Sequence, residues 1–352
     1  MAHPKVRLAR LKSGHQFRFW QEGVLALIFD VVMHTMLIFF LILATGFVAG
    51  KIGVIKRDFL PELAKLITKV LLPCLIFYAT VTGCTRQAMA DNLPMMALAA
   101  GFYATITLIT LLLMKLMRLP YDQGRVFMFC FIFGNTGFVG IPLMSSVFPD
   151  LGLLYMALFS IVDTPVFWTL GVWLATPKER RAEHFEGSEA EGGSVHSLRH
   201  VARNAADVLL TPNIVAMVLA FAFVLAEIPL PGLLADALSM VASATSAMCM
   251  IYLGALLCFS DVLAAVRRKE LYVGVTVKMV LLPCAIALLL HQTPLPSDMV
   301  TAITLIAALP TMTIVPMIAA QRGPYGDYAA GITVATLALS LITIPLVTFL
   351  VL

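Results

Sequence analysis

Charged residues are scarce in this chain: they make up 12% of its 352 residues, whereas an average soluble domain carries roughly 25%. The net charge is only +4, with no stripe of lysine or arginine to neutralise phosphates, which excludes nucleic-acid binding. Hydrophobic residues account for 60%, enough for roughly ten membrane spans of about 20 residues each. A soluble core of this length could not bury so much apolar surface. The composition therefore indicates a polytopic integral membrane protein.

Motifs for metal binding and catalysis are also missing. The six cysteines have neither the spacing of a disulfide scaffold nor that of a zinc site, and we interpret them as core residues. The apolar runs contain no Ser–His pair, no pair of aspartates and no metal-binding motif. We therefore expect no enzyme activity, no metal and no cofactor. The cysteines are Cys74, Cys84, Cys130, Cys249, Cys258 and Cys284.

Long apolar runs, separated by charge, proline and glycine, predict ten transmembrane helices. Helices are expected because lipid cannot satisfy the backbone groups of open strands and because the runs are too long for barrel strands. One long polar stretch, residues 176–204, is rich in charge, glycine and serine and is predicted to be a linker. The predicted helices are 26–50, 60–81, 93–117, 125–148, 151–175, 209–227, 233–259, 271–291, 299–320 and 328–351.

The positions of lysine and arginine predict the orientation of these helices, because cytoplasmic loops carry an excess of positive charge. Connections on one side hold 15 lysines and arginines, whereas those on the other side hold only Arg86. We expect a multi-pass protein of the cytoplasmic (inner) membrane, with the central linker in the cytoplasm and the C-terminus outside. The charges counted on the cytoplasmic side are Lys51, Lys56, Arg57, Lys115, Arg118, Arg125, Lys178, Arg180, Arg181, Arg199, Arg203, Arg267, Arg268, Lys269 and Arg322.

Residues 1–24 form a basic N-terminal tail that the ten-helix arrangement would place outside, against the charge rule. A signal peptide does not explain the tail, because the apolar run that follows is too long and has no convincing cleavage site. Two interpretations remain. In the first, the tail is an unusual periplasmic or interfacial segment. In the second, translation begins at Met33 or Met36, so residues 1–32 are not translated. We favour the later start.

The linker divides the predicted helices into two sets of five. If the halves arose by duplication, an odd number of spans gives them opposite orientations, as in the inverted repeats of secondary transporters. The similar stretches Lys69–Cys74 and Lys278–Cys284 lie in the second and eighth helices, which an inverted repeat does not superpose, so we attribute their similarity to chance. The expected divisions are the tail over 1–24, a first repeat over 25–175, a cytoplasmic linker over 176–208 and a second repeat over 209–352.

The fourth predicted helix contains the motif GNTGFVGIP. Three glycines, a proline and two polar side chains within nine residues are poorly suited to a continuous helix. A break in mid-membrane persists only where protein or a water-filled cavity satisfies the freed groups, and half-helix ends then offer N–H groups to an anion. The alternative is a close glycine-lined helix contact with a tolerated kink. The candidate binding residues are Asn135, Thr136, Gly137, Gly140 and Pro142.

The ninth predicted helix is interrupted in the same way by LPTMTIVP at residues 309–316. Its two prolines remove backbone donors, and the two threonines between them can bond the loosened backbone. Interrupted segments at corresponding places in the two halves are the best sequence indication of a transporter's binding site, and these are the fourth helices of their respective halves. We add Pro310, Thr311 and Thr313 to the candidate binding residues.

Asp163 and Lys278 are charges well inside predicted helices, whereas Lys65 and Lys69 lie nearer to an interface. A charge at the bilayer centre costs about 2.5–3.5 kcal/mol on insertion scales, so it is seldom kept without a role. One interpretation makes Lys278 the counter-charge for a substrate carboxylate, and Asp163 its resting partner or a proton carrier. The other lets Lys278 snorkel and leaves Asp163 neutral and hydrogen-bonded. We also leave open whether Thr245 in the seventh helix mediates packing or lines a path beside the broken helices.

The sequence resembles the auxin efflux carrier family, and in particular its bacterial-type members. The resemblance rests on GNTGFVGIP in the fourth helix, KVLLPCLIF in the second, LPTMTIVPMIAAQ in the ninth, and the ten-helix plan with its central linker. It covers about residues 32–352, and the motif in the fourth helix is its most specific part. Family members typically begin near the position of Met33 or Met36, in agreement with the later start.

The resemblance implies an all-helical five-plus-five inverted repeat of the sodium/proton antiporter or bile-acid transporter kind. It implies that the fourth and ninth helices cross at their broken middles, near Pro142 and Pro310. Substrates in the family are small organic anions, auxin in plants and malate or malonate for some bacterial relatives. By similarity, Asn135 and its neighbours would help to bind the substrate.

The chain departs from the family pattern in two places. Asp163 stands where an uncharged asparagine is common, which could alter coupling. The seventh helix lacks a proline usual ahead of Gly254, which puts the shape of that helix in doubt. The linker also lacks the large hydrophilic loop of the best-known plant carriers, so we do not expect auxin itself to be the substrate.

We therefore expect a secondary transporter that moves a small carboxylate, with malate- or malonate-like anions favoured, by an elevator-like or rocking motion. Its partners would be the organic anion, the lipid bilayer and a coupling proton or sodium ion, and a homodimer is left open. The alternative is a membrane receptor or sensor that binds a small carboxylate without transport.

Overall fold

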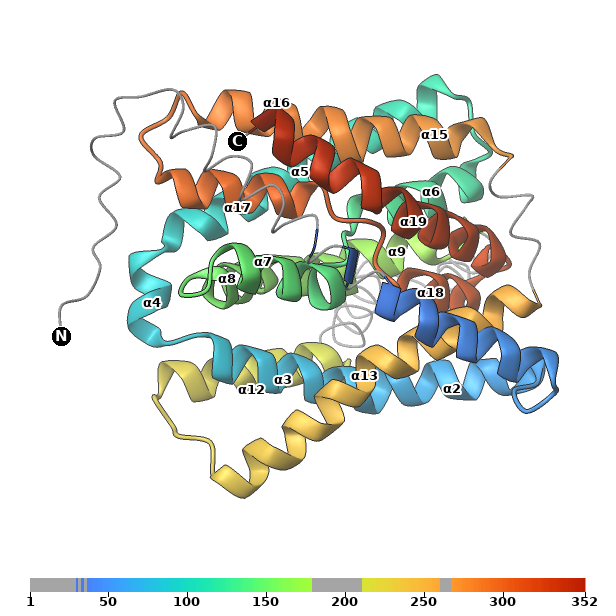
Figure 1. Ribbon diagram of the computed structural model, residues 1–352, viewed down its shortest axis with the longest axis horizontal. Helices are drawn as coiled ribbons and strands as arrows, with labels where there is room; N and C mark the ends of the chain where they lie inside the picture. Colours follow the sequence, from blue (N-terminus) through green and yellow to red (C-terminus); the bar gives the residue numbers. More distant parts are fainter. Residues whose placement is uncertain (1–29, 31–32, 35–36, 179–210, 260–266, 352) are drawn as a thin grey trace, which may run out of the picture.

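A computed structural model describes residue 30 and residues 33–34, 37–178, 211–259 and 267–351 (Figure 1). Across these residues the chain is helical and contains no β-strand, apart from an isolated bridge between Gly134 and Thr311. This confirms the expected all-helical class. The basic tail over 1–24 and most of the predicted linker over 176–208 lie outside the described residues.

The elements before the linker begin with a helix at Leu37–Lys51. They continue with η1 (Arg57–Phe59), α2 (Leu60–Leu66), η2 (Ile67–Leu71), α3 (Leu72–Gly83), α4 (Arg86–Asp91), α5 (Leu93–Leu116), α6 (Tyr121–Ile132), η3 (Thr136–Gly140), α7 (Ile141–Val147), α8 (Gly152–Val166), η4 (Phe167–Gly171) and α9 (Val172–Ala175). After the linker come α12 (Pro212–Leu225), α13 (Gly232–Cys258), α15 (Lys269–Thr276), η5 (Val277–Leu281), α16 (Leu282–Leu290), α17 (Ser297–Ala307), α18 (Val315–Arg322) and α19 (Gly326–Val351).

Six helices in the described part of the chain are long and apolar enough to cross a membrane. Four shorter apolar helices fall at the other expected positions. The structure thus supports a multi-pass membrane protein, while the count of ten spans stays a prediction. The six long helices are Arg57–Gly83, Leu93–Leu116, Gly152–Ala175, Gly232–Cys258, Lys269–Leu290 and Gly326–Leu350; the shorter ones are Leu37–Lys51, Thr136–Ser145, Pro212–Leu225 and Ser297–Ala307.

Four π-helical segments occur within these helices, and each lies two residues from a proline. In η2, η3 and η5 the proline follows the segment, whereas in η4 it precedes it; these residues are Pro73, Pro142, Pro283 and Pro165. Proline has no N–H group and clashes with the carbonyl one turn earlier, so in η2, η3 and η5 an extra residue in the turn relieves the crowding. The similar stretches Lys69–Cys74 and Lys278–Cys284 also share a local structure. Both stretches carry the same π-turn followed by Leu-Pro.

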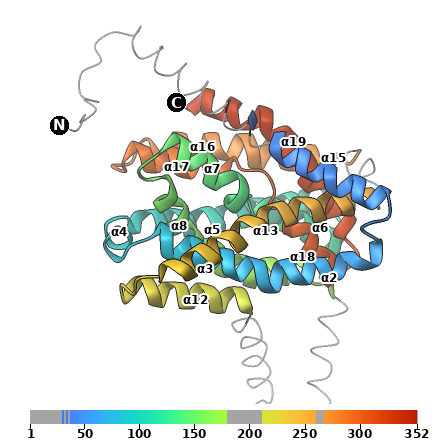
Figure 2. The ribbon, with the colours of Figure 1, turned by 60° about the horizontal axis from the view of Figure 1, so that its bottom comes forward.

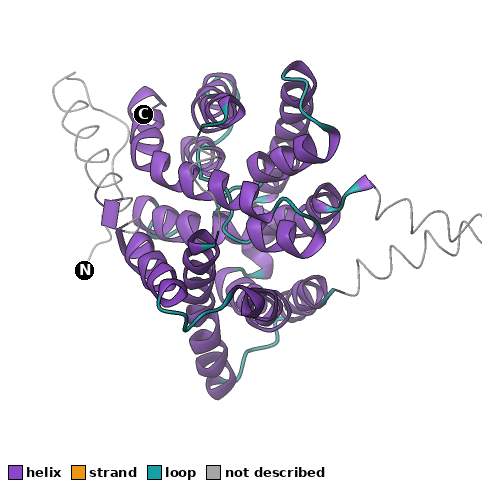
Figure 3. Cartoon of the chain, turned by 90° about the vertical axis from the view of Figure 1, so that its right-hand side faces the viewer, coloured by secondary structure: helices purple, strands orange, loops and turns teal. Residues whose placement is uncertain are grey.

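The helices form two groups: α2, α3, α12 and α13 lie along the lower part of Figure 1, below α5, α15, α16 and α17, and Figure 2 shows the blue N-terminal helix passing close to α19. The α3 group consists of the helix Leu37–Lys51 with α2, η2, α3, α12 and α13, in which α3 packs against α12 and α13. The crossing group consists of α5 to α9 and α15 to α19, in which α5 packs against α6 and α8, and α16 against α17 and α19. The groups meet where α13 contacts α19, where α8 contacts α3 and α12, and where α18 contacts α2. Figure 3 looks along the helices, several of which are seen end-on.

The helices that precede the two breaks, α6 and α17, lie at the centre of the crossing group. Every residue from Gly124 to Ile132 in α6 is buried, as is every residue from Met299 to Ala307 in α17. A helix that is buried on all sides belongs inside a bundle rather than against lipid. This position brings the ends of α6 and α17 together in the interior of the protein.

Two polar side chains of the α3 group donate hydrogen bonds to carbonyls of the π-turn η2. Leu72 N–H reaches back five residues to Ile67 O, so the next bond of this kind would need an N–H that Pro73 lacks. Asn213 Nδ2 supplies the donor instead, at 2.9 Å from Thr68 O. Thr245 Oγ1 donates to Val241 O of its own helix at 3.0 Å and also lies 3.3 Å from Leu71 O of η2. Thr245 therefore mediates helix packing.

The helix Leu37–Lys51 crosses α13 at two glycines. A Cβ atom on Gly254 would lie 1.9 Å from Leu43 O, and one on Gly46 would lie 2.2 Å from Ile251 O. Only glycine permits two backbones to approach this closely, which is the usual way that membrane helices pack. The α13 helix runs without interruption through this contact, so the missing proline ahead of Gly254 leaves it continuous.

We expect Gly254→Ala to destabilise the protein, because the added methyl group must push two backbones apart. The cost of overpacking is typically about 1–3 kcal/mol. The thermal unfolding of purified protein in detergent measures this effect. Gly101→Ala in α5 is the matched control, because a Cβ there would meet no atom within 4 Å. Equal unfolding temperatures for the two variants would contradict the close crossing.

Candidate functional site

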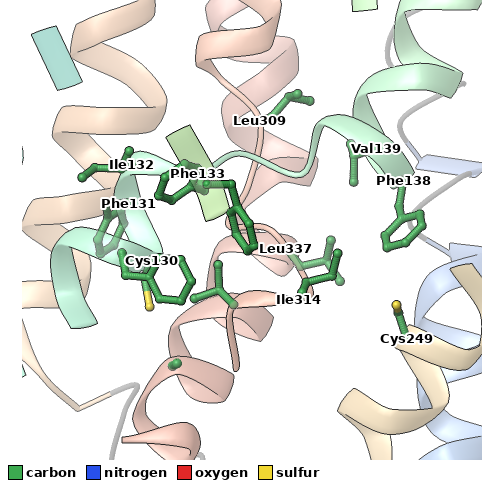
Figure 4. Close-up of a cluster of buried hydrophobic side chains, with 14 of the residues drawn as sticks. Cys130, Phe131, Ile132, Phe133, Phe138, Val139, Cys249, Leu309, Ile314 and Leu337 are labelled. Atoms are coloured by element: carbon green, nitrogen blue, oxygen red, sulfur yellow. The ribbon is translucent and has the colours of Figure 1, made fainter. Parts of the chain in front are cut away.

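The two helix breaks pair with each other through their backbones. Asn135 N–H donates to Pro310 O at 2.7 Å, and Met312 N–H donates to Phe133 O at 3.1 Å. Gly134 and Thr311 form the antiparallel bridge between these bonds. Figure 4 shows the chain between Ile132 and Phe138 beside the segment that leads from Leu309 to Ile314. Each break thus supplies the hydrogen bonds that the other cannot obtain from lipid.

Asn135 places an unpaired amide group at this crossing. Its side-chain Oδ1 accepts the N–H of Phe138 at 3.3 Å and so caps η3. Because an N–H group needs an oxygen acceptor, this bond fixes which end of the side chain is Oδ1 and leaves Nδ2 as a donor. Asn135 is fully buried, and its Nδ2 has no hydrogen-bond partner among the described residues. A buried donor without an acceptor is costly, and it invites a ligand oxygen.

A cavity of about 100 Å³ lies between the crossing and the α3 group. The fourth-helix break contributes Asn135, Thr136 and Gly137 to its wall, and Asp163 comes from α8. Side chains of α3 and the rings of η4 make most of the remaining wall apolar. Gly137 has open space where a Cβ would stand, with no atom within 4 Å. The site therefore combines a few polar groups with a largely apolar enclosure, as small-molecule sites do.

Asp163 is buried and hydrogen-bonded rather than exposed to the bilayer. The Tyr103 hydroxyl donates to its Oδ1, and the Thr136 hydroxyl donates to its Oδ2 at 3.3 Å. Tyr103 itself packs among aromatic rings, with ring centroids 5.7 Å from Phe133 and 5.6 Å from Phe159. These contacts connect a carboxyl group on α8 directly to the broken helix.

Lys278 lies at the crossing but not in the cavity wall. The residue belongs to η5 and is buried, and its Nζ donates to Leu309 O, just before Pro310. None of the ion pairs between described residues joins Lys278 to Asp163, so the expected resting pair is not present. The reason is that each charge already has polar partners in a different break. Snorkelling of Lys278 to the interface is also excluded by its burial.

Comparison with known proteins identifies the family. A family model described as membrane transport protein matches residues 31–348, which is most of the chain. The chain belongs to the auxin efflux carrier family. This confirms the resemblance drawn from the three motifs, and it makes the chain a membrane transporter. A search of curated proteins found no match.

The remaining candidate binding residues of this carrier shape the place where the two helix breaks cross. Thr311 Oγ1 donates to Cys130 O at 2.8 Å, and Thr311 N–H donates to Thr336 Oγ1 at 3.1 Å. Thr313 is fully buried, and its Oγ1 has no hydrogen-bond partner among the described residues. A Cβ on Gly140 would lie 3.0 Å from Leu309 Cδ1, so glycine allows the two breaks to pack closely. Pro142 is the second residue of α7, which begins directly after the π-turn η3.

Sequence reasoning missed Tyr103 and misjudged Arg125. Tyr103 sits 60 residues from Asp163 in an apolar helix, and no local pattern marks it. Arg125 was counted with the cytoplasmic connections, but it is buried in α6. Its guanidinium donates to the carbonyls of Trp173 and Thr176, where the fifth helix ends, and it stacks over the Trp173 ring. Arginine near a helix C-terminus is stabilised there by the helix dipole.

We expect Lys278→Met to destabilise this carrier by about 1–3 kcal/mol, because the substitution leaves a buried carbonyl without its donor. Thermal unfolding in detergent provides the measurement. Lys65→Met serves as the control, because Lys65 forms an exposed pair with Glu62 at 2.6 Å, and such pairs contribute little. If both variants unfold at the wild-type temperature, the contact between Lys278 and Leu309 is not structural.

Proposed function

We propose that this carrier is a secondary transporter that moves a small organic anion across the cytoplasmic membrane, coupled to a proton or another ion. Malate- and malonate-like carboxylates are the favoured substrates. The observation that carries the proposal is the buried Asn135 amide, which lacks an acceptor and lines a cavity at the meeting point of two broken helices. A carboxylate oxygen is the acceptor that suits this donor.

The local electrostatics favour an anion in the cavity. Residues Thr136 to Phe138 belong to the first turn of a helix that continues into α7, and they line the cavity. The N-terminal end of a helix carries partial positive charge, which attracts anions, while here Thr136 N–H is bonded to Gly134 O and Phe138 N–H to Asn135 Oδ1. Lys278 adds a positive charge to the crossing and lies near Gly134. Asn135, Thr136 and Gly137 would then contact the substrate, with Lys278 as the compensating charge.

The other candidate residues would maintain the crossing on which this site depends. In our proposal Gly140 and Pro142 shape the first break, and Pro310, Thr311 and Thr313 shape the second. The antiparallel pairing of the breaks supports an arrangement of ten helices as a five-plus-five inverted repeat. The repeats would span residues 25–175 and 209–352. The distribution of lysine and arginine supports a cytoplasmic linker over 176–208 and an external C-terminus.

The position of the cavity suggests how transport would occur. The cavity lies between the α3 group and the crossing group, so a displacement of one group relative to the other would open it to one side or the other. The crossing group contains both breaks and would carry the substrate by an elevator-like or rocking motion. Asp163 lines the same cavity and would carry the coupled proton.

Uptake of labelled malate and malonate into proteoliposomes, with and without an imposed pH gradient, tests this proposal. We expect saturable uptake that the gradient stimulates, and we expect Asn135→Ala to reduce it at least about tenfold, the effect of one lost hydrogen bond to a charged group. Asn92→Ala is the matched control, because its amide bonds Ala88 O on α4, away from the cavity.

Tryptophan fluorescence separates binding from transport. Trp168 lines the cavity, so an anion that binds there should change its emission, and Trp168→Phe should remove that signal. The Trp173→Phe control should retain it, because Trp173 packs against Arg125. A fluorescence change without uptake would identify a receptor instead of a transporter. Neither binding nor uptake of the two anions would overturn the assignment of dicarboxylates.

A further inference from the structure

Three side chains from three separate elements form one hydrogen-bonded chain beside the cavity. Tyr103 comes from α5, Asp163 from α8, and Thr136 from the first turn after the fourth-helix break. Both hydroxyls donate to the Asp163 carboxyl group, one to each oxygen. Thr136 adjoins Asn135, whose amide lacks an acceptor. The carboxyl group and the proposed anion site are therefore separated by one residue of the broken helix.

An anion in the cavity and an ionised Asp163 would repel each other. The anion would occupy the cavity whose wall includes Asp163, and charges in this largely apolar space interact more strongly than in water. A proton on Asp163 removes the repulsion, so proton binding and anion binding favour each other. Linkage makes this reciprocal: the anion raises the affinity for the proton by the same factor.

Of the titratable groups around Asp163, Tyr103 is the one that bonds to its carboxyl group and so influences its protonation. Among the residues that the structure describes, Asp163 is the one ionisable side chain in the cavity wall, and Tyr103 is the titratable side chain that donates to it. Among the described residues, the nearby Lys278 amine is bonded to Leu309 O. No other charged side chain from α3, α5, η3 or η4 lines the cavity. At the far end of α8, Asp298 lies near Tyr155 rather than near Asp163.

The two hydroxyl donors stabilise the ionised form of Asp163 more than its protonated form. A carboxylate has oxygens free to accept both hydroxyl hydrogens, whereas a protonated carboxyl group uses one oxygen as a donor. Hydrogen bonds to an ionised acceptor are about twice as strong as those to a neutral one. The Tyr103 and Thr136 hydroxyls therefore favour the carboxylate, and the loss of either donor makes protonation easier.

We propose that Tyr103 is the positioning residue that sets the pH at which Asp163 takes up its proton, and that Thr136 couples this proton to the anion site at Asn135. This inference rests on the proposed function, in which the protein moves an anion together with a proton. It adds a residue outside the cavity wall that controls the pH dependence without contacting the substrate.

The first test needs no substrate. Infrared spectra of the purified full-length protein, recorded as a function of pH, follow the C=O stretch of protonated carboxyl groups, and the difference from Asp163→Asn isolates the Asp163 band. We expect Tyr103→Phe to move the midpoint of this band upward by about one pH unit or more, since one donor to the charged form is lost. Thr136→Val should move it upward by less, because its bond is 3.3 Å long.

Two conservative variants provide the controls. Thr136→Ser keeps the hydroxyl and should keep the wild-type midpoint. Tyr155→Phe removes a hydroxyl from a buried tyrosine of α8 that is not bonded to Asp163, and it should also keep the wild-type midpoint. A wild-type midpoint in Tyr103→Phe, or a titrating band that survives Asp163→Asn, would overturn the inference.

The second test connects the proton to transport. Uptake of labelled malonate as a function of external pH should shift its midpoint in Tyr103→Phe in the same direction as the infrared band, and Asp163→Asn should lose the pH dependence. An infrared shift with no malonate uptake in the wild-type protein would support the role of Tyr103 while contradicting the proposed substrate. Uptake with unchanged pH dependence in Asp163→Asn would overturn the coupling.

Discussion

The backbone pairing between the two broken helices is the contact on which the rest of this structure depends. A break in a membrane helix leaves N–H and carbonyl groups without partners, and in hydrocarbon each unpaired group costs several kcal/mol. Here the carbonyl of Pro310 accepts the N–H of Asn135, and the carbonyl of Phe133 accepts the N–H of Met312. Neither break could persist alone, so each one defines the position of the other.

Proline determines where the other irregular turns occur, and side chains from neighbouring helices complete the hydrogen bonding. In η2 the donors are Asn213 and Thr245. At the second break the donor to Leu309 O is Lys278. Each of these side chains comes from a different helix from the backbone it binds. The irregular turns therefore join helices to one another, besides bending them.

Two of the buried charges, Asp163 and Lys278, bond to the broken helices and have separate partners. Asp163 bonds the first break through Thr136, and Lys278 bonds the second through Leu309. This separation places a titratable carboxyl group in the cavity wall and keeps the ammonium group within the crossing. A carrier that holds the two charges apart can protonate one without disrupting an ion pair.

The sequence by itself determined the helical membrane class, the two breaks and the family, because the lengths of apolar runs and the positions of proline and glycine are local properties. It also identified Asn135, Asp163 and Lys278, since polar groups stand out in apolar helices. Only the tertiary structure decided their partners. Tyr103 reaches Asp163 across 60 residues, and Arg125, which the sequence assigns to a connection, is buried in α6 and donates to the carbonyls at the end of the fifth helix. Partners of this kind depend on which helix faces pack together, and no local pattern in the chain encodes that choice.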